Sequence, residues 1–119
     1  MKSIEDFTSE LKFVEDLLYF DGPLISWYKN NSNENFLYWW LNSETHAQNW
    51  ALLKLSQTTV DDFINKKKTC LETIKSAFEY YLVCCVFEKD KSYNLVYSCS
   101  FEEIPKDCLP KEDVFLYHD

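Results

Sequence analysis

The stretch Phe36-Leu37-Tyr38-Trp39-Trp40-Leu41 decides the fold of this 119-residue chain. Every residue in it is apolar or aromatic, and a run of this length and composition is typical of a β-strand. Because side chains alternate between the two faces of a strand, Leu37, Trp39 and Leu41 point one way and their neighbours point the other. Both sets are apolar, so the strand is either covered on both faces or leaves an aromatic row in water.

An antiparallel meander is expected around this stretch. Leu24 to Tyr28 precedes it as a strand and His46 to Leu55 follows it, and the polar runs between them favour turns. Phe13 to Phe20 is a further apolar run of strand length. It ends at Asp21-Gly22-Pro23, where the only glycine of the chain can supply the positive φ of a tight turn.

Helical periodicity appears on both sides of the meander. Ser3 to Leu11 is predicted as a short helix, with Ser3 as its N-cap and apolar residues recurring on one face. Thr58 or Thr59 is predicted to cap a second helix, which closes at the lysines of 66–68. Thr69 to Ser76 has the spacing of a third helix.

The C-terminal part favours a hairpin. Tyr80 to Phe87 and Tyr93 to Phe101 are strand-length runs separated by a polar turn, and the hairpin of Tyr80–Phe87 with Tyr93–Cys99 is expected at the core of the sheet. The apolar end Val114 to Tyr117 is expected to lie against the domain. The prediction is one α+β domain, residues 1–119, with a mostly antiparallel sheet (meander plus C-terminal hairpin), two short helices on one face and a short N-terminal helix.

Part of the chain resembles a known family. The run Tyr19-Phe20-Asp21-Gly22-Pro23-Leu24 is followed by a strand, the 36–40 aromatic run, Trp50 to Leu55 and the Val60 to Ile64 helix. This order is similar to a small bacterial domain family with an Asp-Gly-Pro-Leu turn after an aromatic residue, whose members are functionally uncharacterised. The resemblance covers residues 17–75. It implies an α+β layout and no catalytic residue.

The charge of the chain favours a basic partner. Its twelve basic residues are all lysine and stand against twenty carboxylates, for a net charge of -8. Direct binding to nucleic acid depends on neutralising phosphates with cations, so we expect none here. The same charge attracts basic proteins and speeds their encounter. Acidity also keeps an aromatic-rich protein in solution, which is the alternative explanation.

The sequence predicts no catalytic, cofactor or metal site, and we expect no enzyme. Arginine is absent and there is no glycine-rich phosphate loop. A cysteine–histidine dyad needs both residues in one cleft, and His46 and His118 are expected at exposed positions. Adjacent carboxylates such as Glu15-Asp16 diverge on a helix or strand. The five cysteines contain no Cys-x-x-Cys pair, so they are predicted to be reduced thiols (Cys70, Cys84, Cys85, Cys99 and Cys108).

We expect a cytoplasmic protein that binds and neutralises another protein. No apolar run approaches the roughly 20 residues of a membrane span, and no signal-peptide pattern follows Met1. The concrete hypothesis is a bacterial immunity protein or antitoxin against a basic effector such as a nuclease. A phage-encoded inhibitor of a host defence enzyme, which imitates nucleic acid, and a structural subunit are alternatives. The candidate partner-binding residues are Trp27, Trp39, Trp40, Asp61, Asp62, Glu102 and Glu103.

Overall fold

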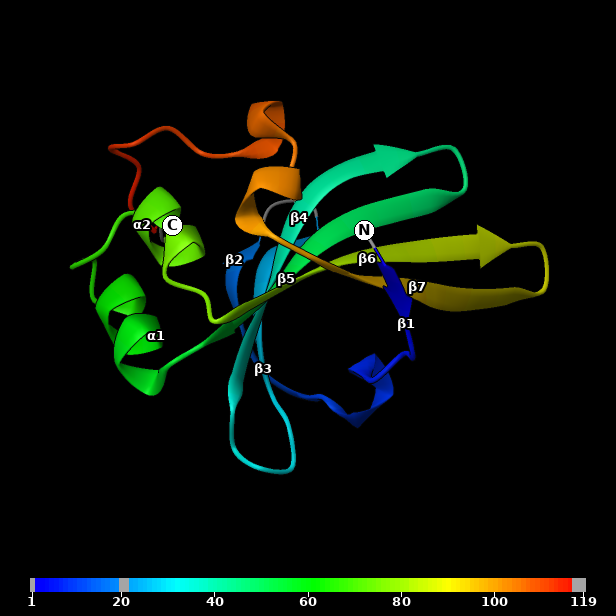
Figure 1. Cartoon of the computed structure of the whole chain (residues 1–119), viewed down its shortest axis with the longest axis horizontal. Helices are drawn as coiled ribbons and strands as arrows, with labels where there is room; N and C mark the ends of the chain where they lie inside the picture. The colour runs from blue at the N-terminus through cyan, green and yellow to red at the C-terminus, as the bar shows by residue number, and fades with distance from the viewer. Residues whose placement is uncertain (1, 20–21, 117–119) are drawn as a thin grey trace.

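A seven-stranded antiparallel sheet forms the centre of the molecule, with the strand order β1-β7-β6-β5-β4-β3-β2 (Figure 1). The structure is a computed structural model that describes residues 2–19 and 22–116. The strands are β1 (Lys2–Ile4), β2 (Lys12–Tyr19), β3 (Pro23–Lys29), β4 (Asn35–Glu44), β5 (Ala47–Leu55), β6 (Glu79–Glu88) and β7 (Lys91–Cys99). The helices are α1 (Gln57–Ile64) and α2 (Cys70–Lys75), with short 3-10 turns η1 (Thr8–Glu10), η2 (Phe101–Glu103) and η3 (Lys106–Cys108).

The sheet is a meander with one added strand. Strands β2 to β7 pair in chain order, and β1 then pairs with β7 at the far edge. The predicted C-terminal hairpin is confirmed, since Val83 pairs with Val96 across β6 and β7. The centre of the sheet is β5 rather than the hairpin. The α+β class and the mostly antiparallel sheet therefore follow the sequence prediction.

Strand β4 continues to Glu44, into the polar run Asn42 to Thr45 that the sequence favoured as a turn before the next strand. A bulge between Trp40 and Asn42 shifts the register, after which the strand pairs with β5 as far as Glu44. The Asn49 amide donates to Asn42 Oδ1 at 2.8 Å, so polar side chains also bond across this end of the pair. A bulge accommodates one extra residue without ending the hydrogen-bonded pairing of the two strands. The strand therefore extends past its apolar segment.

One face of the sheet, here called the helix face, carries Ile25, Leu37, Trp39, Ala51 and Leu53. Helices α1 and α2 gather at one end of the sheet (Figure 1) and add Val60, Phe63, Cys70 and Ile74 to the same core. The C-terminal segment adds Ile104 and Leu116, each 2% exposed. Tyr117, the last residue of the predicted apolar end, and His118 lie outside the described residues.

Both helices begin at side-chain caps. The N-cap of α1 is Ser56, whose hydroxyl accepts the Thr59 N–H at 3.1 Å, and not Thr58 or Thr59 as the sequence suggested. The N-cap bonds to the N–H of the third helical residue, and Thr59 occupies that position. In α2 the Thr69 hydroxyl accepts from Glu72 N–H at 3.1 Å while Glu72 accepts from Thr69 N–H at 3.0 Å, which is a capping box.

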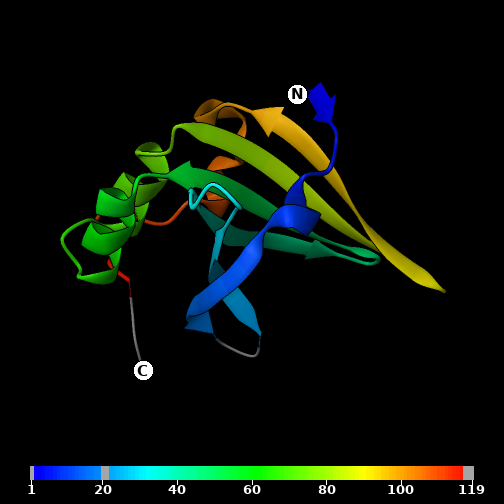
Figure 2. The same ribbon diagram turned by 90° about the horizontal axis from the view of Figure 1, so that it is seen from below.

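The opposite face, here called the aromatic face, has a different cover. Its buried centre consists of Phe36, Leu52, Val83 and Val96, with Tyr28, Tyr38, Trp50 and Tyr81 half-buried around it. The N-terminal segment packs over this centre through Ile4, Phe7 and Leu11. Figure 2 shows that segment passing across the sheet from β7 toward β2. The two-sided apolar pattern of β4 is thus satisfied by covers on both faces.

The predicted helix from Ser3 to Leu11 is wrong. Lys2–Ile4 is a strand paired with β7, and only Thr8–Glu10 has a helical turn. The Phe7 ring lies 4.9 Å from the Tyr81 ring and 5.9 Å from the Phe36 ring, measured between centroids. An isolated helix this short is only marginally stable, so pairing with β7 and burial of Phe7 override the helical period.

The turn before β3 is only partly described. Gly22 has φ +136°, in the region that side chains rarely adopt, as the sequence predicted for this glycine. Residue 21 of the predicted turn and residue 20, the last of the predicted strand before it, lie outside the described ranges. The chain enters β3 at Pro23 and pairs with β2 on one side and β4 on the other.

Phe63 provides a test of the helix-face core. It is fully buried and its ring centroid lies 5.5 Å from that of Trp39. We expect Phe63→Ala to lower the free energy of unfolding by about 3–5 kcal/mol, through lost burial and the cavity left behind. Urea denaturation followed by tryptophan fluorescence measures this change.

The matched control is Phe78→Ala, because Phe78 is 69% exposed. We expect that change to stay within about 0.5 kcal/mol. Equal losses for the two variants would contradict the assigned core.

Candidate functional site: a hollow on the aromatic face

Four rings form a row across consecutive strands of the aromatic face. Phe13, Tyr28, Tyr38 and Trp50 lie on β2, β3, β4 and β5, with successive centroids 5.5, 5.2 and 5.9 Å apart. Each ring meets the next edge to face, at interplanar angles of 75°, 72° and 87°. This is the favoured geometry of aromatic pairs, and such cross-strand contacts stabilise a sheet. We call these four residues the aromatic row.

A hollow of about 380 Å³ lies between the aromatic row and the N-terminal segment. We call it the sheet hollow. Its lining is Asp6, Thr8 and Ser9 from the N-terminal segment and Ser26, Tyr28, Tyr38, Trp50, Cys85 and Asn94 from the sheet. Within the part of the chain that the structure describes, the lining includes one carboxylate and no lysine or histidine. The hollow therefore combines aromatic walls, several hydroxyl groups and a single negative charge.

Hydrogen bonds hold the N-terminal wall of the hollow in place. Asp6 Oδ1 accepts from the Thr8 N–H at 2.8 Å and from the Thr8 hydroxyl at 2.5 Å. The Asn94 amide on β7 donates to the Thr8 hydroxyl oxygen at 2.9 Å. Asp6 and Thr8 are thereby tied to a strand that is 86 positions away in the chain.

A second carboxylate lies beside the hollow on the edge strand. The Ser26 hydroxyl, which lines the hollow, donates to Asp16 Oδ1 at 2.6 Å. Asp16 is exposed on β2 and pairs with Ser26 in the sheet register. The negative potential of the hollow thus has two sources on different elements, Asp6 above the sheet and Asp16 at its edge.

The phenols of Tyr28 and Tyr38 and the thiol of Cys85, which line the hollow, have raised pKa values and stay in their neutral forms. Burial raises the pKa of Tyr38, and the nearby charge of Asp6 adds to this. Burial also raises the pKa of Tyr28, with a further contribution from Asp16. The pKa of Cys85 is raised by burial first and by Cys84 and Asp6 next. Because the thiolate is the reactive form of cysteine, Cys85 is a poor nucleophile here.

The predicted tryptophans are divided between the two faces. Trp39 belongs to the helix-face core, at 8% exposed. Trp27 is half-buried on the same face, where its Nε1–H donates to Asn35 Oδ1 at 3.0 Å and Lys29 Nζ lies 5.6 Å from the ring centroid. Trp40 is half-buried on the aromatic face and pairs with Trp50 across β4 and β5. Trp39 is therefore not exposed for a partner, whereas Trp40 is the sheet partner of Trp50, which lines the hollow.

The predicted carboxylates lie on other elements. Asp61, exposed on α1, accepts from the Gln57 amide at 3.0 Å, and the backbone carbonyl of Asp62 accepts the Lys67 N–H at 2.7 Å. Glu102 is exposed in η2, and Glu103 accepts the Ser100 N–H at 3.1 Å. None of the seven predicted partner-binding residues lines the sheet hollow.

Sequence reasoning missed Asp6, Tyr28, Tyr38 and Trp50 as site residues. One signal was available, since strand alternation already placed Tyr38 and Trp40 on the face opposite Trp39. Asp6 had no such signal, because its place depends on the path of the N-terminal segment.

A second hollow lies between α2 and the C-terminal segment. It measures about 560 Å³ and is lined by Leu71, Lys75, Phe101, Glu102, Ile104, Lys106, Leu109 and Pro110. Lys75 Nζ lies 5.9 Å from the Phe101 ring centroid. Its two lysines and one glutamate give mixed charge and no convergent polar groups. This hollow indicates no particular ligand.

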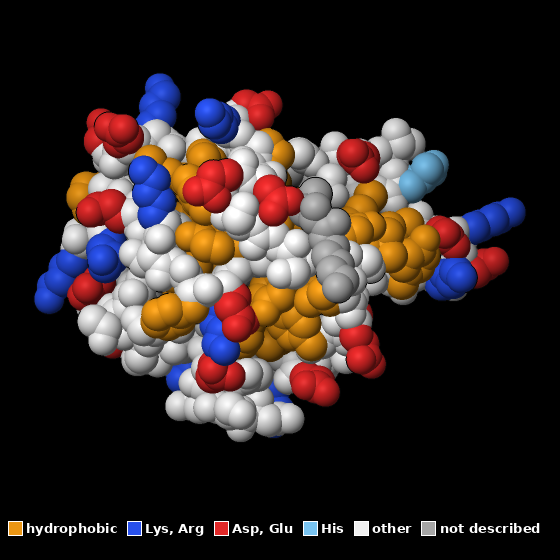
Figure 3. Space-filling view, in the orientation of Figure 1, with side chains coloured by type: hydrophobic (Ala, Val, Ile, Leu, Met, Phe, Trp, Pro, Cys, Tyr) orange, Lys and Arg blue, Asp and Glu red, His pale blue; other side chains and the backbone are white. Residues whose placement is uncertain are grey.

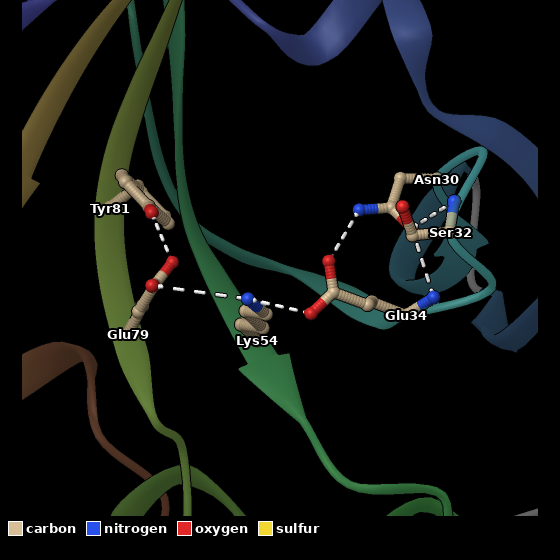
Figure 4. A network of polar contacts seen from close by, with 6 residues as sticks. All are labelled: Asn30, Ser32, Glu34, Lys54, Glu79 and Tyr81. Atoms are coloured by element: carbon tan, nitrogen blue, oxygen red, sulfur yellow. Dashed lines mark hydrogen bonds and ion pairs between the residues drawn. The ribbon is translucent and has the colours of Figure 1, made fainter.

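A polar network borders the aromatic face beside β5 (Figure 4). Lys54 Nζ lies 2.8 Å from Glu34 Oε2 and 3.9 Å from Glu79 Oε1. The Asn30 amide donates to Glu34 Oε1 at 2.9 Å, and the Tyr81 hydroxyl donates to Glu79. The network ties the β3–β4 turn to β5 and β6. The bonds from Lys54 and then Asn30 lower the pKa of Glu34, while the bond with Glu34 raises that of Lys54.

Comparison of the chain with protein-family models, with curated proteins and with solved structures finds no match. Across residues 2–19 and 22–116, no three or more metal-ligating side chains come together in a way that could hold an ion. Neither α1, α2 nor any other helix of the described chain has the length and apolar character to cross a membrane. The geometry of the aromatic face therefore carries the functional argument.

The Glu34 network predicts a pH-dependent stability term. A lowered pKa in the folded state stabilises the fold above the ordinary pKa of glutamate, about 4.3, and this contribution is lost as pH falls through the lowered value. We expect Glu34→Gln to reduce the urea midpoint slightly at pH 7. The difference from the unsubstituted protein should shrink steadily below about pH 4.

Glu44→Gln is the control, because Glu44 is an exposed carboxylate at the end of β4. We expect Glu44→Gln to leave the urea midpoint almost unchanged at pH 7 and at pH 3. A Glu34→Gln deficit that is as large at pH 3 as at pH 7 would rule out the charge-based explanation.

Proposed function

We propose that this chain binds and neutralises another protein, as an immunity protein or antitoxin does against a basic toxic effector such as a nuclease. The observation that carries the proposal is the sheet hollow, where half-buried rings of the aromatic row lie beside the carboxylate of Asp6. Aromatic residues are enriched at protein–protein interfaces and in their hot spots. A neighbouring carboxylate adds electrostatic complementarity to a basic partner.

The overall charge supports a basic partner. A net charge of -8 produces a long-range field that steers a cationic protein toward the chain before contact. In Figure 3, patches of hydrophobic side chains on one face of the molecule are bordered by carboxylates. Charge then governs the encounter, and the aromatic contacts govern the lifetime of the complex.

The chemistry of the hollow also favours binding over catalysis. Its phenols and its thiol have raised pKa values, so they are neither activated bases nor activated nucleophiles. A neutralising protein needs no reactive group, because it acts by covering the partner. Rigid aromatic side chains serve that purpose at low entropic cost.

The proposal is tested by isolating the partner and measuring association rates as salt increases. Raising sodium chloride from about 0.05 M to about 0.5 M shortens the Debye length to about 4 Å. We expect association to slow several-fold or more and dissociation to change much less. Stopped-flow fluorescence with the chain as the limiting species gives both rates.

Charge reversal supplies the matched comparison. Asp16→Lys and Asp61→Lys change exposed carboxylates, the first beside the hollow and the second on α1. We expect Asp16→Lys to mimic added salt by slowing association, and Asp61→Lys to slow it less. An association rate that is independent of both salt and charge reversal would contradict the electrostatic basis of the proposal.

A further inference from the structure

We infer that the sheet hollow receives one arginine side chain from the basic partner. This inference rests on the proposed function and specifies how the partner is held. The occupant follows from three properties of the hollow, which are its size, its charge and its aromatic walls. The composition of the chain then limits where that occupant can come from.

The size of the hollow suits one long side chain. Its volume of about 380 Å³ is near the lower limit for ligand pockets, about 300–1,000 Å³. The aromatic row continues beyond the hollow to Phe13, which is 56% exposed on the edge strand β2. A partner whose side chain enters the hollow can also cover Phe13. A free small molecule confined to the hollow leaves that ring in water, so the surroundings favour a protein.

The charge of the hollow selects a cation. Among the described residues that line the hollow, Asp6 is the only charged one, and Asp16 adds a second carboxylate through Ser26. A carboxylate has about four lone-pair sites on two oxygens. The bonds from Thr8 to Asp6 both go to Oδ1, so they use only part of this accepting capacity. A cation at Asp6 meets no competing ammonium group from the lining residues that the structure describes.

The walls select a guanidinium in preference to an ammonium. A guanidinium is planar, weakly hydrated and able to stack on aromatic faces, and it carries five N–H donors. Around it the hollow presents the rings of Tyr28, Tyr38 and Trp50. Acceptors are spread over the carboxylate of Asp6 and the hydroxyl oxygens of Ser9 and Ser26. A lysine ammonium is a compact point charge and uses fewer of these groups at once.

The composition of the chain excludes a second copy of itself as the source. All twelve basic residues are lysine, so no copy of this chain carries an arginine. The guanidinium must therefore come from a different protein. This agrees with a heteromeric complex rather than self-association through the aromatic face.

The direct test uses N-acetyl-arginine methylamide as the probe. It is titrated into ¹⁵N-labelled protein while the indole N–H signals of the four tryptophans are followed. We expect weak, saturable shifts for Trp50 and for the backbone amides of residues 6–9, with little change at Trp27 and Trp39. The citrulline analogue, which has the same shape without charge, should bind at least five-fold more weakly, and the lysine analogue should also bind more weakly.

Two substitutions test the assigned groups. Asp6→Asn removes the charge but keeps an oxygen that can accept from Thr8, and we expect several-fold weaker probe binding. Asp61→Asn, the same change on α1, should have no effect. Tyr28→Leu removes one aromatic wall without touching the N-terminal segment, so it tests the hollow even if Asp6→Asn disturbs that segment. We expect it to weaken binding as well.

The outcomes separate this inference from the proposed function. Absence of saturable shifts, equal binding of the citrulline or lysine analogue, or tighter binding of choline would overturn the arginine assignment. A partner whose association depends on salt but whose affinity is unchanged by Asp6→Asn and Tyr28→Leu would also overturn it, while leaving the proposed function intact. Probe binding at Trp50 together with salt-independent association of the partner would instead contradict the proposed function alone.

Discussion

The whole structure depends on a sheet that is apolar on both faces and therefore needs two covers. Strand β4 places Leu37 and Trp39 on one face and Phe36 on the other, and all three are buried. Burying apolar surface is the main favourable term in folding, so neither face can be left in water without a large loss of stability. The two helices and the C-terminal segment cover one face, and the N-terminal segment covers the other.

The two covers differ in thickness, and this difference produces the site. The helix face meets two helices and the C-terminal segment, and its core extends to the fully buried Phe63 on α1. The aromatic face meets a single strand-and-turn segment, anchored by Phe7 and by the bonds of Thr8 to Asp6 and Asn94. One segment is too narrow to cover the width of the sheet. The rings beside it stay half-exposed, and the hollow lies along its edge.

The sequence predicted the strands well because alternation and turn residues are local signals. The meander, the C-terminal hairpin and both helices were predicted on that basis, and the two-sided character of β4 was visible in its alternation. The N-terminal helix was wrong because pairing of Ile4 with Val96 is a contact across most of the chain. The prediction of the site residues was incomplete for the same reason. Alternation assigns Tyr38 to a face, but only the path of the N-terminal segment brings Asp6 to it.

The position of Phe7 is the most direct test of this account, because the segment that it anchors forms one wall of the hollow. The ring centroid of Phe7 lies 4.9 Å from that of Tyr81 and 5.9 Å from that of Phe36. Proton NMR of the folded protein, with assigned aromatic side chains, should therefore show strong nuclear Overhauser effects from the Phe7 ring to both other rings. The absence of both effects would contradict the account, because the aromatic face would then lack its cover and the hollow its wall.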